Sequence, residues 1–418
     1  MTSSTAVPRW LSIVGIGEDG VDGLSPTARG LIESANVVVG GKRHLALADS
    51  IIKQTARRIA WPTPITDGLD EIANERGNRV VVLATGDPFH YGVGTLLAKN
   101  FKITEINCIP QASAFALAAA QLGWSLQTTK LISLHGRPLE GLNRHLLPNA
   151  KILALTWDAT TPSRVADLLT KRGLAKAQLT VLESLGGPSQ RIQACEASAF
   201  DLRDIDDLNT LAIELPLVEN VSIRANTFAR LASGLPDEAF EHDGQLTRHD
   251  IRTMTLAALD PRPGEHLWDV GLGAGSIAIE WLLTDQTMGA TGFERDPVRV
   301  ARALSNAANL GVPELNVITG DAPATLEHVA SRDLPDAVFI GGGLTKKGVF
   351  ESSWSTLRTG GRLVANAVTL ESQARLTDLH ARHGGELKKI EIATADGVGR
   401  MRGWRPAMPV VQWRVTKP

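Results

Sequence analysis

Runs of apolar residues alternate along most of the chain with stretches of helical periodicity. Residues 80–84 are all apolar, as expected for a strand of a parallel sheet that is covered on both faces. Residues 248–259 have the spacing of an amphipathic helix. Its apolar side chains, on or near one face, are Ile251, Met254, Leu256 and Leu259. This alternation predicts an α/β protein in which helices pack on mainly parallel sheets.

In the first half, Ser25 and Pro26 mark a helix start, because serine caps a helix N-terminus and proline suits its first position. That helix is expected to end near Asn36. Further helices are expected at residues 94–99, 114–122 and 163–172. Strands are expected at residues 10–16, 37–39, 80–84, 103–109, 131–134, 151–155, 178–182 and 211–215.

The second half shows the same alternation after a stretch with weak periodicity and several helix breakers. Strands are expected at residues 266–270, 290–293, 315–319, 337–340 and 361–367, and helices at residues 248–259, 276–283, 297–310 and 371–383. Two late strands, 386–393 and 410–415, are expected to form an antiparallel pair at the sheet edge. The two halves do not resemble each other, so two different folds are expected in one chain.

A length of 418 residues exceeds one ordinary core and predicts two domains. We place them at residues 8–215 and 241–418. The breakers Pro216 and Gly234 fall in the segment between them, so residues 216–240 are expected to be a linker.

The composition of the chain argues against several classes of function. The net charge is −2, so no general basic field would attract nucleic acid or an anionic membrane surface. No stretch approaches the roughly 20 apolar residues of a membrane span, and no signal peptide is recognisable. The two cysteines, Cys108 and Cys195, form no disulfide framework and no CxxC pair. Together these observations favour a cytoplasmic enzyme. No metal site is expected, because His380 and His383 have no carboxylate or cysteine companion.

The most specific local signal is a glycine-rich loop between a strand and a helix. Gly271, Gly273 and Gly275 alternate with Leu272 and Ala274 directly after an acidic strand end. A dinucleotide fingerprint would be GxGxxG, but here the third glycine comes one position earlier. The form GxGxG after an acid usually holds the amino-acid part of S-adenosylmethionine. The spacing therefore favours a methyl donor over NAD, which stays open as an alternative.

Two acids at later strand ends support a nucleoside ligand. Glu294 ends the next strand, where an acid accepts hydrogen bonds from a ribose diol. Asp321 and Ala322 follow the strand after that, and Asp321 is placed to accept from an adenine amino group. Because these strands are consecutive and parallel, all three elements are expected at the carboxyl edge of one doubly wound sheet.

Longer motifs make the two halves resemble known families. The second half resembles the decarboxylating precorrin methyltransferase domain in the runs DGQLTRHDIR at 243–252, WDVGLGAGS at 268–276, GDAP at 320–323, FIGGG at 339–343 and GRLVANAVTLE at 361–371. The first half resembles the tetrapyrrole methylase family in VGIG at 14–17, VVGGKRH at 38–44, TGDP at 85–88, YGVG at 91–94, SAF at 113–115, LGW at 122–124 and SLHGRP at 133–138.

Both halves, in this order, are similar to the fused family of decarboxylating precorrin-6Y methyltransferases. The resemblance implies a two-lobed tetrapyrrole methylase fold followed by a Rossmann-like class I methyltransferase. It also implies S-adenosyl-L-methionine as cofactor, a precorrin substrate and a homo-oligomer. The first half would methylate ring carbon C5. The second would methylate C15 and remove the carboxyl of the C12 acetate, giving precorrin-8 from precorrin-6B in cobalamin biosynthesis.

The resemblance also implies two sets of donor-binding residues. In the first half they are Gly86, Asp87, Ser113 and Ala114. In the second half they are Thr247, Gly271, Leu272, Gly273, Ala274, Gly275, Glu294, Asp321 and Ala322. No pair of nucleophile and base stands out, so no catalytic residue is assigned.

A substrate with many carboxylates is expected to bind near cationic side chains at each site, and arginine can donate two hydrogen bonds to one carboxylate. The candidates are Arg43 with His44, His135 with Arg137, and Arg248 with His249 and Arg252. Two rival functions remain open besides an NAD-dependent oxidoreductase: an RNA or protein methyltransferase, and a non-enzymatic carrier of tetrapyrrole. A basic domain with stacking aromatics would favour the first rival, but the chain has one tyrosine and almost no net charge.

Overall fold

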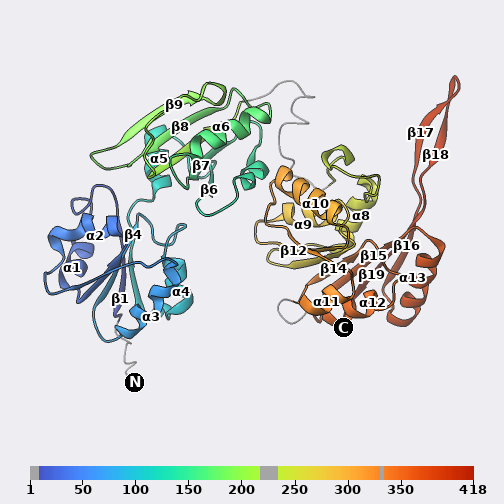
Figure 1. Ribbon diagram of the computed structural model, residues 1–418, viewed down its shortest axis with the longest axis horizontal. Coiled ribbons are helices and arrows are strands. Elements are labelled where there is room, and N and C mark those ends of the chain that lie inside the picture. The colour runs from blue at the N-terminus through green and yellow to red at the C-terminus, as the bar shows by residue number, and fades with distance from the viewer. Residues whose placement is uncertain (1–8, 217–233, 330–333) are drawn as a thin grey trace. The chain divides into compact units, whose positions relative to one another are not determined.

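The computed structural model describes residues 9–216, 234–329 and 334–418 (Figure 1). The described residues up to 137 and from 148 to 216 form one compact unit. Those from 138 to 147 and from 234 onward form a second. Most of the expected linker, 216–240, lies outside the described residues.

The first lobe of the first unit is a parallel sheet with the strand order β3-β2-β4-β1-β5. Its strands are β1 (Leu11–Ile16), β2 (Val37–Gly40), β3 (Arg57–Ala60), β4 (Val80–Thr85) and β5 (Ile106–Ile109). Its helices are α1 (Pro26–Ser34), α2 (Lys42–Ala48), α3 (Leu69–Asn74) and α4 (Gly94–Asn100), with short 3₁₀ turns at Asp49–Ile51, Ile65–Gly68 and Ile103–Glu105. Separate apolar clusters pack on the two faces of the sheet, which explains why its central strands are mostly apolar.

The second lobe is a mixed sheet with the order β6-β7-β10-β8-β9, in which only β6 and β7 run parallel. Its strands are β6 (Lys130–Ser133), β7 (Lys151–Leu155), β8 (Gln178–Glu183), β9 (Arg191–Glu196) and β10 (Asn209–Glu214). Its helices are α5 (Ala114–Leu122) and α6 (Thr161–Lys171), with a 3₁₀ turn at Ala197–Ala199. Phe115 and Ala118 of α5 pack on Leu153, Leu182 and Ala212 of this sheet.

The second unit is built on a seven-stranded sheet with the order β13-β12-β11-β14-β15-β19-β16. Its first five strands are parallel, and β19 pairs antiparallel with both of its neighbours. The strands are β11 (His266–Val270), β12 (Gly289–Glu294), β13 (Asn316–Thr319), β14 (Ala337–Ile340), β15 (Arg362–Ala367), β16 (Glu386–Ile390) and β19 (Val410–Thr416).

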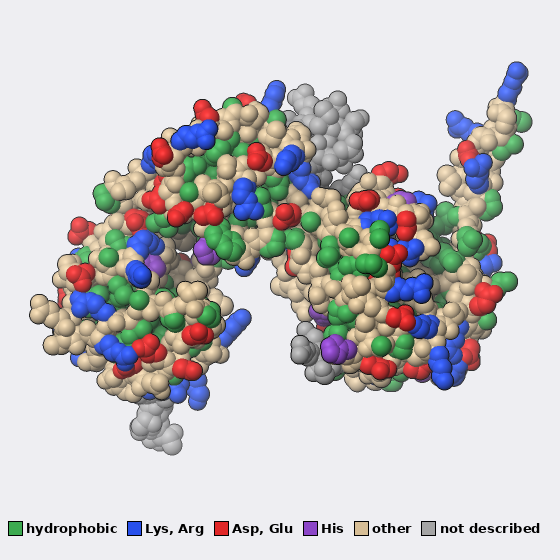
Figure 2. Space-filling model, in the orientation of Figure 1, with side chains coloured by type: hydrophobic (Ala, Val, Ile, Leu, Met, Phe, Trp, Pro, Cys, Tyr) green, Lys and Arg blue, Asp and Glu red, His purple; other side chains and the backbone are tan. Residues whose placement is uncertain are grey.

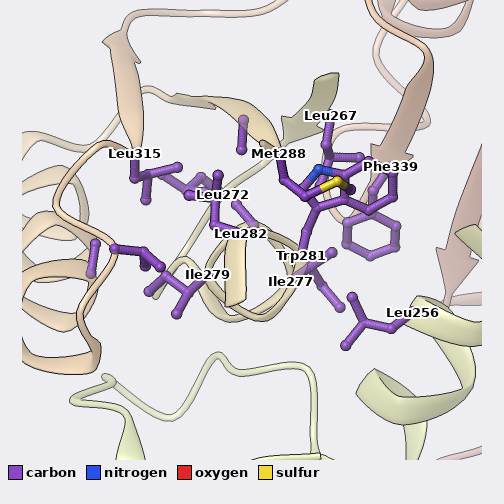
Figure 3. Close-up of a cluster of buried hydrophobic side chains, with 14 of the residues drawn as sticks. Leu256, Leu267, Leu272, Ile277, Ile279, Trp281, Leu282, Met288, Leu315 and Phe339 are labelled. Carbon is purple, nitrogen blue, oxygen red and sulfur yellow. The ribbon is translucent and has the colours of Figure 1, made fainter. Parts of the chain in front are cut away.

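Helices cover both faces of this sheet. One face carries α8 (His249–Leu259), α9 (Ser276–Thr284) and α10 (Pro297–Leu310), and the other carries α11 (Ala324–Val329), α12 (Val349–Thr356) and α13 (Leu370–His383). Figure 3 shows the core under α9, where Trp281 packs near Leu267, Met288 and Phe339. Short 3₁₀ turns lie at Leu139–His145 and Asp237–Ala239. This architecture confirms the prediction of an α/β protein with two different folds.

A two-stranded hairpin, β17 (Ala393–Val398) and β18 (Met401–Pro406), projects away from the large sheet (Figure 1). Its strands pair only with each other. The sequence pattern did not predict it, because neither strand has a buried face to produce an alternation of apolar and polar residues. Among the described residues, no helix is both long and apolar enough to cross a membrane.

Several element predictions need correction. Residues 103–105 form a 3₁₀ turn rather than the start of a strand, and the strand expected at 386–393 ends at Ile390. The short elements α2, β3, α3, β9, α11 and α12 were missed. On α8, Met254 is exposed, whereas Arg252 and Thr255 are buried with Leu256 and Leu259. Both polar side chains have partners inside the second unit: Arg252 pairs with Glu280, and the Thr255 hydroxyl accepts hydrogen bonds from Asn366 and Gln412.

Candidate active sites

The first unit contains a cleft of about 1120 Å³ between its two lobes. The first lobe contributes the loop after β4 and the start of α2. The second lobe contributes the ends of β6 and β7 and the start of β10. In Figure 2, histidine and basic side chains gather where this unit is hollowed. The cleft is large enough for a ligand much bigger than a nucleoside alone.

Four of the expected donor-binding residues meet at one place in this cleft. Gly86 follows β4 with φ +54°, and a Cβ there would lie 2.7 Å from the carbonyl oxygen of Ala112. Glycine therefore lets the loop press against the segment that leads into α5. That segment ends in Ser113, the N-cap of α5, whose hydroxyl accepts a hydrogen bond from Ala116 N at 3.2 Å. Asp87 and Ala114 also line the cleft.

Arg43 and His44, at the start of α2, converge on Thr85. Arg43 Nη2 donates to Thr85 Oγ1 at 2.9 Å, and His44 Nε2 lies 2.8 Å from the same oxygen. Arg43 also forms an ion pair with Glu18. Burial, with the neighbouring Arg43 charge, lowers the pKa of His44 to about 4. His44 is therefore neutral at pH 7, and only Arg43 of this pair is a cation.

Aromatic and basic side chains come together in the cleft, with His135, Arg137 and Trp157 from the second lobe and Tyr91 from the segment between β4 and α4. The His135 ring lies 5.8 Å from the exposed Trp157 ring, and the Arg137 guanidinium lies 5.4 Å from the Tyr91 ring. All four residues line the cleft. Flat apolar faces next to cations suit a planar, conjugated ring that bears carboxylates.

In the second unit, the three glycines of the expected donor loop all have positive φ, from +58° to +82°. A Cβ on Gly271 would lie 2.8 Å from Gly342 N, so this glycine lets two loops approach at the carboxyl edge of β11 and β14. At Gly273 a Cβ would make only ordinary contacts, the nearest with Gln245 O at 3.9 Å. Leu272 and Ala274 are buried and anchor the loop in the core.

Two carboxylates lie under and beside this loop. Glu294, at the end of β12, accepts hydrogen bonds from Gly273 N at 3.0 Å, Arg295 N at 3.0 Å and Asp296 N at 3.1 Å. Asp269, at the end of β11, is 1% exposed and accepts one hydrogen bond, from Ala278 N at 3.2 Å. Burial, together with the negative charge of Glu294, raises the pKa of Asp269 to about 8.

The other expected donor contacts surround the same edge. Gly320 N donates to Glu294 O at 2.9 Å, which brings the loop of Asp321 and Ala322 beside β12. Asp321 is exposed and forms an ion pair with Lys346. Thr247 lies on the segment before α8, and its carbonyl accepts from Arg252 Nη1 at 2.6 Å.

The segment Glu241–Thr247, here called the strap, is held near the glycine loop by residues that the sequence did not single out. Asn306 Nδ2 donates to Ala274 O at 3.0 Å and to Glu241 O at 2.9 Å. Asp243 pairs with Arg299 at 2.9 Å and with Arg302 at 3.2 Å. The spacing of 299, 302 and 306 on one face of α10 is the signal that could have identified them.

The cationic candidates of the second half do not form one group. Arg248 and His249 are exposed, and both contact Asp237. Arg252 has no exposed surface, and its Nε donates to Glu280 at 2.6 Å. Arg252 is therefore committed to a buried ion pair, so the hypothesis that it binds substrate carboxylates is withdrawn.

The fold and the glycine loop of the second unit are those of a Rossmann-like methyltransferase, and a different, two-lobed fold precedes it. Two family models match these parts: "Tetrapyrrole (Corrin/Porphyrin) Methylases" over residues 11–201 and "Precorrin methyltransferase domain" over residues 238–417.

Relatives match almost the whole chain. A precorrin-6Y C(5,15)-methyltransferase [decarboxylating] of Sinorhizobium sp is 49% identical over 411 residues, which cover 98% of this chain and 97% of the relative. The protein of that name from Mycobacterium tuberculosis (strain ATCC 25618 / H37Rv) is 40% identical over 409 residues, covering 97% and 99%. A solved C-terminal domain of the Rhodobacter capsulatus precorrin-6Y C5,15-methyltransferase is 46% identical, covers 45% of this chain and 100% of that chain, and has a TM-score of 0.42.

The chain belongs to the family of precorrin-6Y C5,15-methyltransferases (decarboxylating). The family resemblance found in the sequence is thereby confirmed, and with it the prediction of a methyltransferase.

Proposed function

We propose that this chain methylates precorrin-6B at C5 and C15 and removes the carboxyl of the C12 acetate, giving precorrin-8 in cobalamin biosynthesis. The main support is the match of each unit to its own methyltransferase family, in the order and over the length of the named relatives. Each unit would use S-adenosyl-L-methionine, which supplies an electrophilic methyl group. We assign C5 methylation to residues 8–215, and C15 methylation with decarboxylation to residues 241–418.

The residues of the second unit fit such a donor. Gly271 leaves room where any Cβ would collide with Gly342, so backbone lines the cradle. The Glu294 carboxylate is fixed by three backbone N–H groups, which makes it a rigid acceptor for a ribose diol. The buried carboxylate of Asp269 adds negative potential beneath a positively charged ligand.

In the first unit, Gly86, Asp87, Ser113 and Ala114 would hold the second donor, and the basic and aromatic walls of the cleft would hold the ring. Arg43, His135 and Arg137 would bind ring carboxylates, while Tyr91 and Trp157 cover its faces. Arg248 and His249 would serve the same purpose in the second unit.

The protein's main task in methyl transfer is alignment, because a neutral thioether leaves and positive charge disperses. Positioning and exclusion of water can contribute about 7–11 kcal/mol in favourable cases. Decarboxylation needs an electron sink, and the conjugated ring supplies one. The protein then has to hold and desolvate the acetate.

A mass measurement tests the proposal. The full chain is incubated with precorrin-6B and S-adenosylmethionine, and the expected product has gained two methyl groups and lost carbon dioxide. Gly273→Arg would fill the cradle of the second unit, so we expect one added methyl and a retained carboxyl if the units act independently. Gly264→Arg is the matched control, because Gly264 also has positive φ (+84°) and accepts a Cβ without a clash, but lies in an exposed loop before β11.

An unchanged substrate with the wild-type protein would refute the reaction. A Gly273→Arg product identical to the wild-type product would instead show that the donor of the second reaction binds elsewhere. We further propose that the enzyme works in the cytoplasm, where its two free thiols, Cys108 and Cys195, would remain reduced.

We also propose that the chain forms a homo-oligomer through the β17–β18 hairpin. An isolated two-stranded hairpin is marginally stable in water. This one exposes three large apolar side chains, Val398, Met401 and Trp404, by 65–79%. Association with a second copy would cover these side chains and pair the open strand edges.

A further inference from the structure

Asp269 has an unusual position for a carboxyl group. It is the last but one residue of β11, two positions before the first glycine of the loop, and 1% of its surface is exposed. Its Oδ2 accepts the hydrogen bond from Ala278 N, but its Oδ1 is buried without a hydrogen-bond partner among the described residues. Burying an ionised carboxylate with one donor and no cation is costly, since the lost hydration is barely replaced.

Among the residues that the structure describes, the elements around β11 bring no cation to this carboxyl group. Neighbouring β12 carries Glu294, whose charge opposes ionisation of Asp269, and neighbouring β14 carries no ionisable residue. On α9 the acid Glu280 is paired with Arg252 of α8. On α10, the two arginines nearest its start, Arg299 and Arg302, are paired with Asp243 of the strap. The neutral acid is therefore favoured while no ligand is bound.

S-adenosylmethionine carries a positive sulfonium and a positive ammonium group against one carboxylate. A cation placed near a buried carboxyl group favours its ionised form and lowers its pKa. The glycine loop that follows Asp269 is the part of the site assigned to the amino-acid end of the donor. The missing partner of Oδ1 would therefore be supplied, directly or through water, by the charge of the ligand.

We propose that Asp269 is protonated when the second unit is free of donor and releases this proton to solvent as the donor binds. This inference rests on the proposed function of that site. The balance is simple: a neutral acid and a cationic donor become a carboxylate paired with the donor, plus one proton in solution. Asp269 is thus a charge-compensating residue that couples donor affinity to pH, rather than a catalytic residue.

The sign of the coupling follows from linkage. The pKa of Asp269 is about 8 in the free protein and lower in the complex. Between these two values the donor competes with a proton, so the dissociation constant at the second site falls about tenfold for each unit of rising pH. Above about pH 8 the affinity becomes constant.

Titration calorimetry of the full chain with S-adenosylmethionine, repeated at pH 6.5 in buffers with different ionisation enthalpies, counts the released protons. Wild type should release about one proton more than Asp269→Asn. The number of protons released by donor binding to the first unit is the same in both proteins, so it cancels when the two values are subtracted. Asp378→Asn, an exposed acid on α13, is the matched control and should release as many protons as wild type.

Infrared difference spectroscopy on the wild-type protein removes the dependence on how well Asp269→Asn folds. Donor binding should remove the carbonyl stretch of a protonated, buried carboxylic acid, and a purely structural role for Asp269 would leave it unchanged. Donor binding with equal proton release in wild type and Asp269→Asn, or without the infrared change, overturns the inference alone. If no donor binds to the second unit, so that Gly273→Arg and wild type bind equally, the proposed function fails and the inference with it.

Discussion

Arg252 Nε donates to Glu280 Oε1 at 2.6 Å inside the second unit, and neither side chain is more than 2% exposed. The pair also fixes the chain before α8. Glu280 accepts from the backbone N–H groups of Gly234 at 2.5 Å and Leu235 at 3.0 Å, while Arg252 donates to the carbonyl oxygens of Leu235 and Thr247. This one ion pair therefore connects α8, α9 and the segment that leads to the strap.

Replacing Arg252 by methionine should lower the free energy of unfolding of the second unit by about 3–5 kcal/mol, because Glu280 then stays buried without a cation. Hydrogen exchange of residues 249–284, measured in the full chain, reports this loss. Arg248→Met is the control: that side chain is 62% exposed and should cost less than about 1 kcal/mol. Equal protection in both variants would show that the pair does not stabilise the unit.

Releasing the strap should weaken donor binding in the second unit. The double variant Arg299→Ala/Arg302→Ala removes both arginine partners of Asp243 and leaves its hydrogen bond from Gln245 N, and we expect the dissociation constant of the donor to rise about fivefold. The control is Arg375→Ala/Arg382→Ala, which removes two arginines that pair with Asp378 on the other face of the sheet and should leave the dissociation constant unchanged. Titration calorimetry with S-adenosylmethionine measures both. An unchanged affinity would mean that the strap does not contact the donor.

The pH range of this effect follows from Asp243. A hydrogen bond from Gln245 N, followed by the contacts with Arg299 and Arg302, lowers the pKa of Asp243 to about 2. A carboxyl group whose pKa is lowered by folding stabilises the folded protein at pH values above its ordinary pKa near 3.8. This contribution is lost as the pH falls through about 2. The dissociation constant of the double variant Arg299→Ala/Arg302→Ala, divided by that of wild type, should thus be the same at pH 5 and pH 8.

The first unit should lose stability on mild acidification because of His44. Its pKa is lowered to about 4 by burial, with Arg43 as a second cause, whereas an unfolded histidine titrates near 6.5. Between pH 6.5 and 4 the unfolded chain therefore binds the proton more readily, so the free energy of unfolding decreases as the pH is lowered. His44→Gln should reduce the drop in melting temperature between pH 7 and pH 5. His135→Gln, an exposed histidine on the same cleft, should leave the drop unchanged, and an equal effect of both variants would contradict the assignment.

Oligomer formation should depend on the hairpin. Trp404→Ser/Met401→Ser removes two side chains that are 76% and 79% exposed, and we expect the molar mass from light scattering to fall toward that of one chain. Trp157→Ser is the control, since Trp157 is also exposed but lies in the cleft of the first unit. A wild-type protein that is already a monomer, or a double variant with the wild-type mass, would refute an interface through the hairpin.

The long elements of the fold could be predicted because their periodicity is set by burial on a sheet. The bounds of α10 and β11 agree with those read from the sequence, and the glycine loop was recognised from its spacing. Short elements such as α2 and β3 were missed, because four to seven residues carry too little periodicity to distinguish a strand or helix from a loop.

The sequence by itself determined the two families, the order of the two folds and the acids at consecutive strand ends. Local spacing and motif identity are properties of the chain, so they require no knowledge of contacts. Only the tertiary structure decided that Arg252 pairs with Glu280 and that Asn306 joins the strap to the glycine loop. It also decided that Oδ1 of Asp269 lies buried with no hydrogen-bond partner in the described part of the chain. Ionisation and charge pairing depend on which distant residues share a buried space, and only the packing of strands and helices sets that neighbourhood.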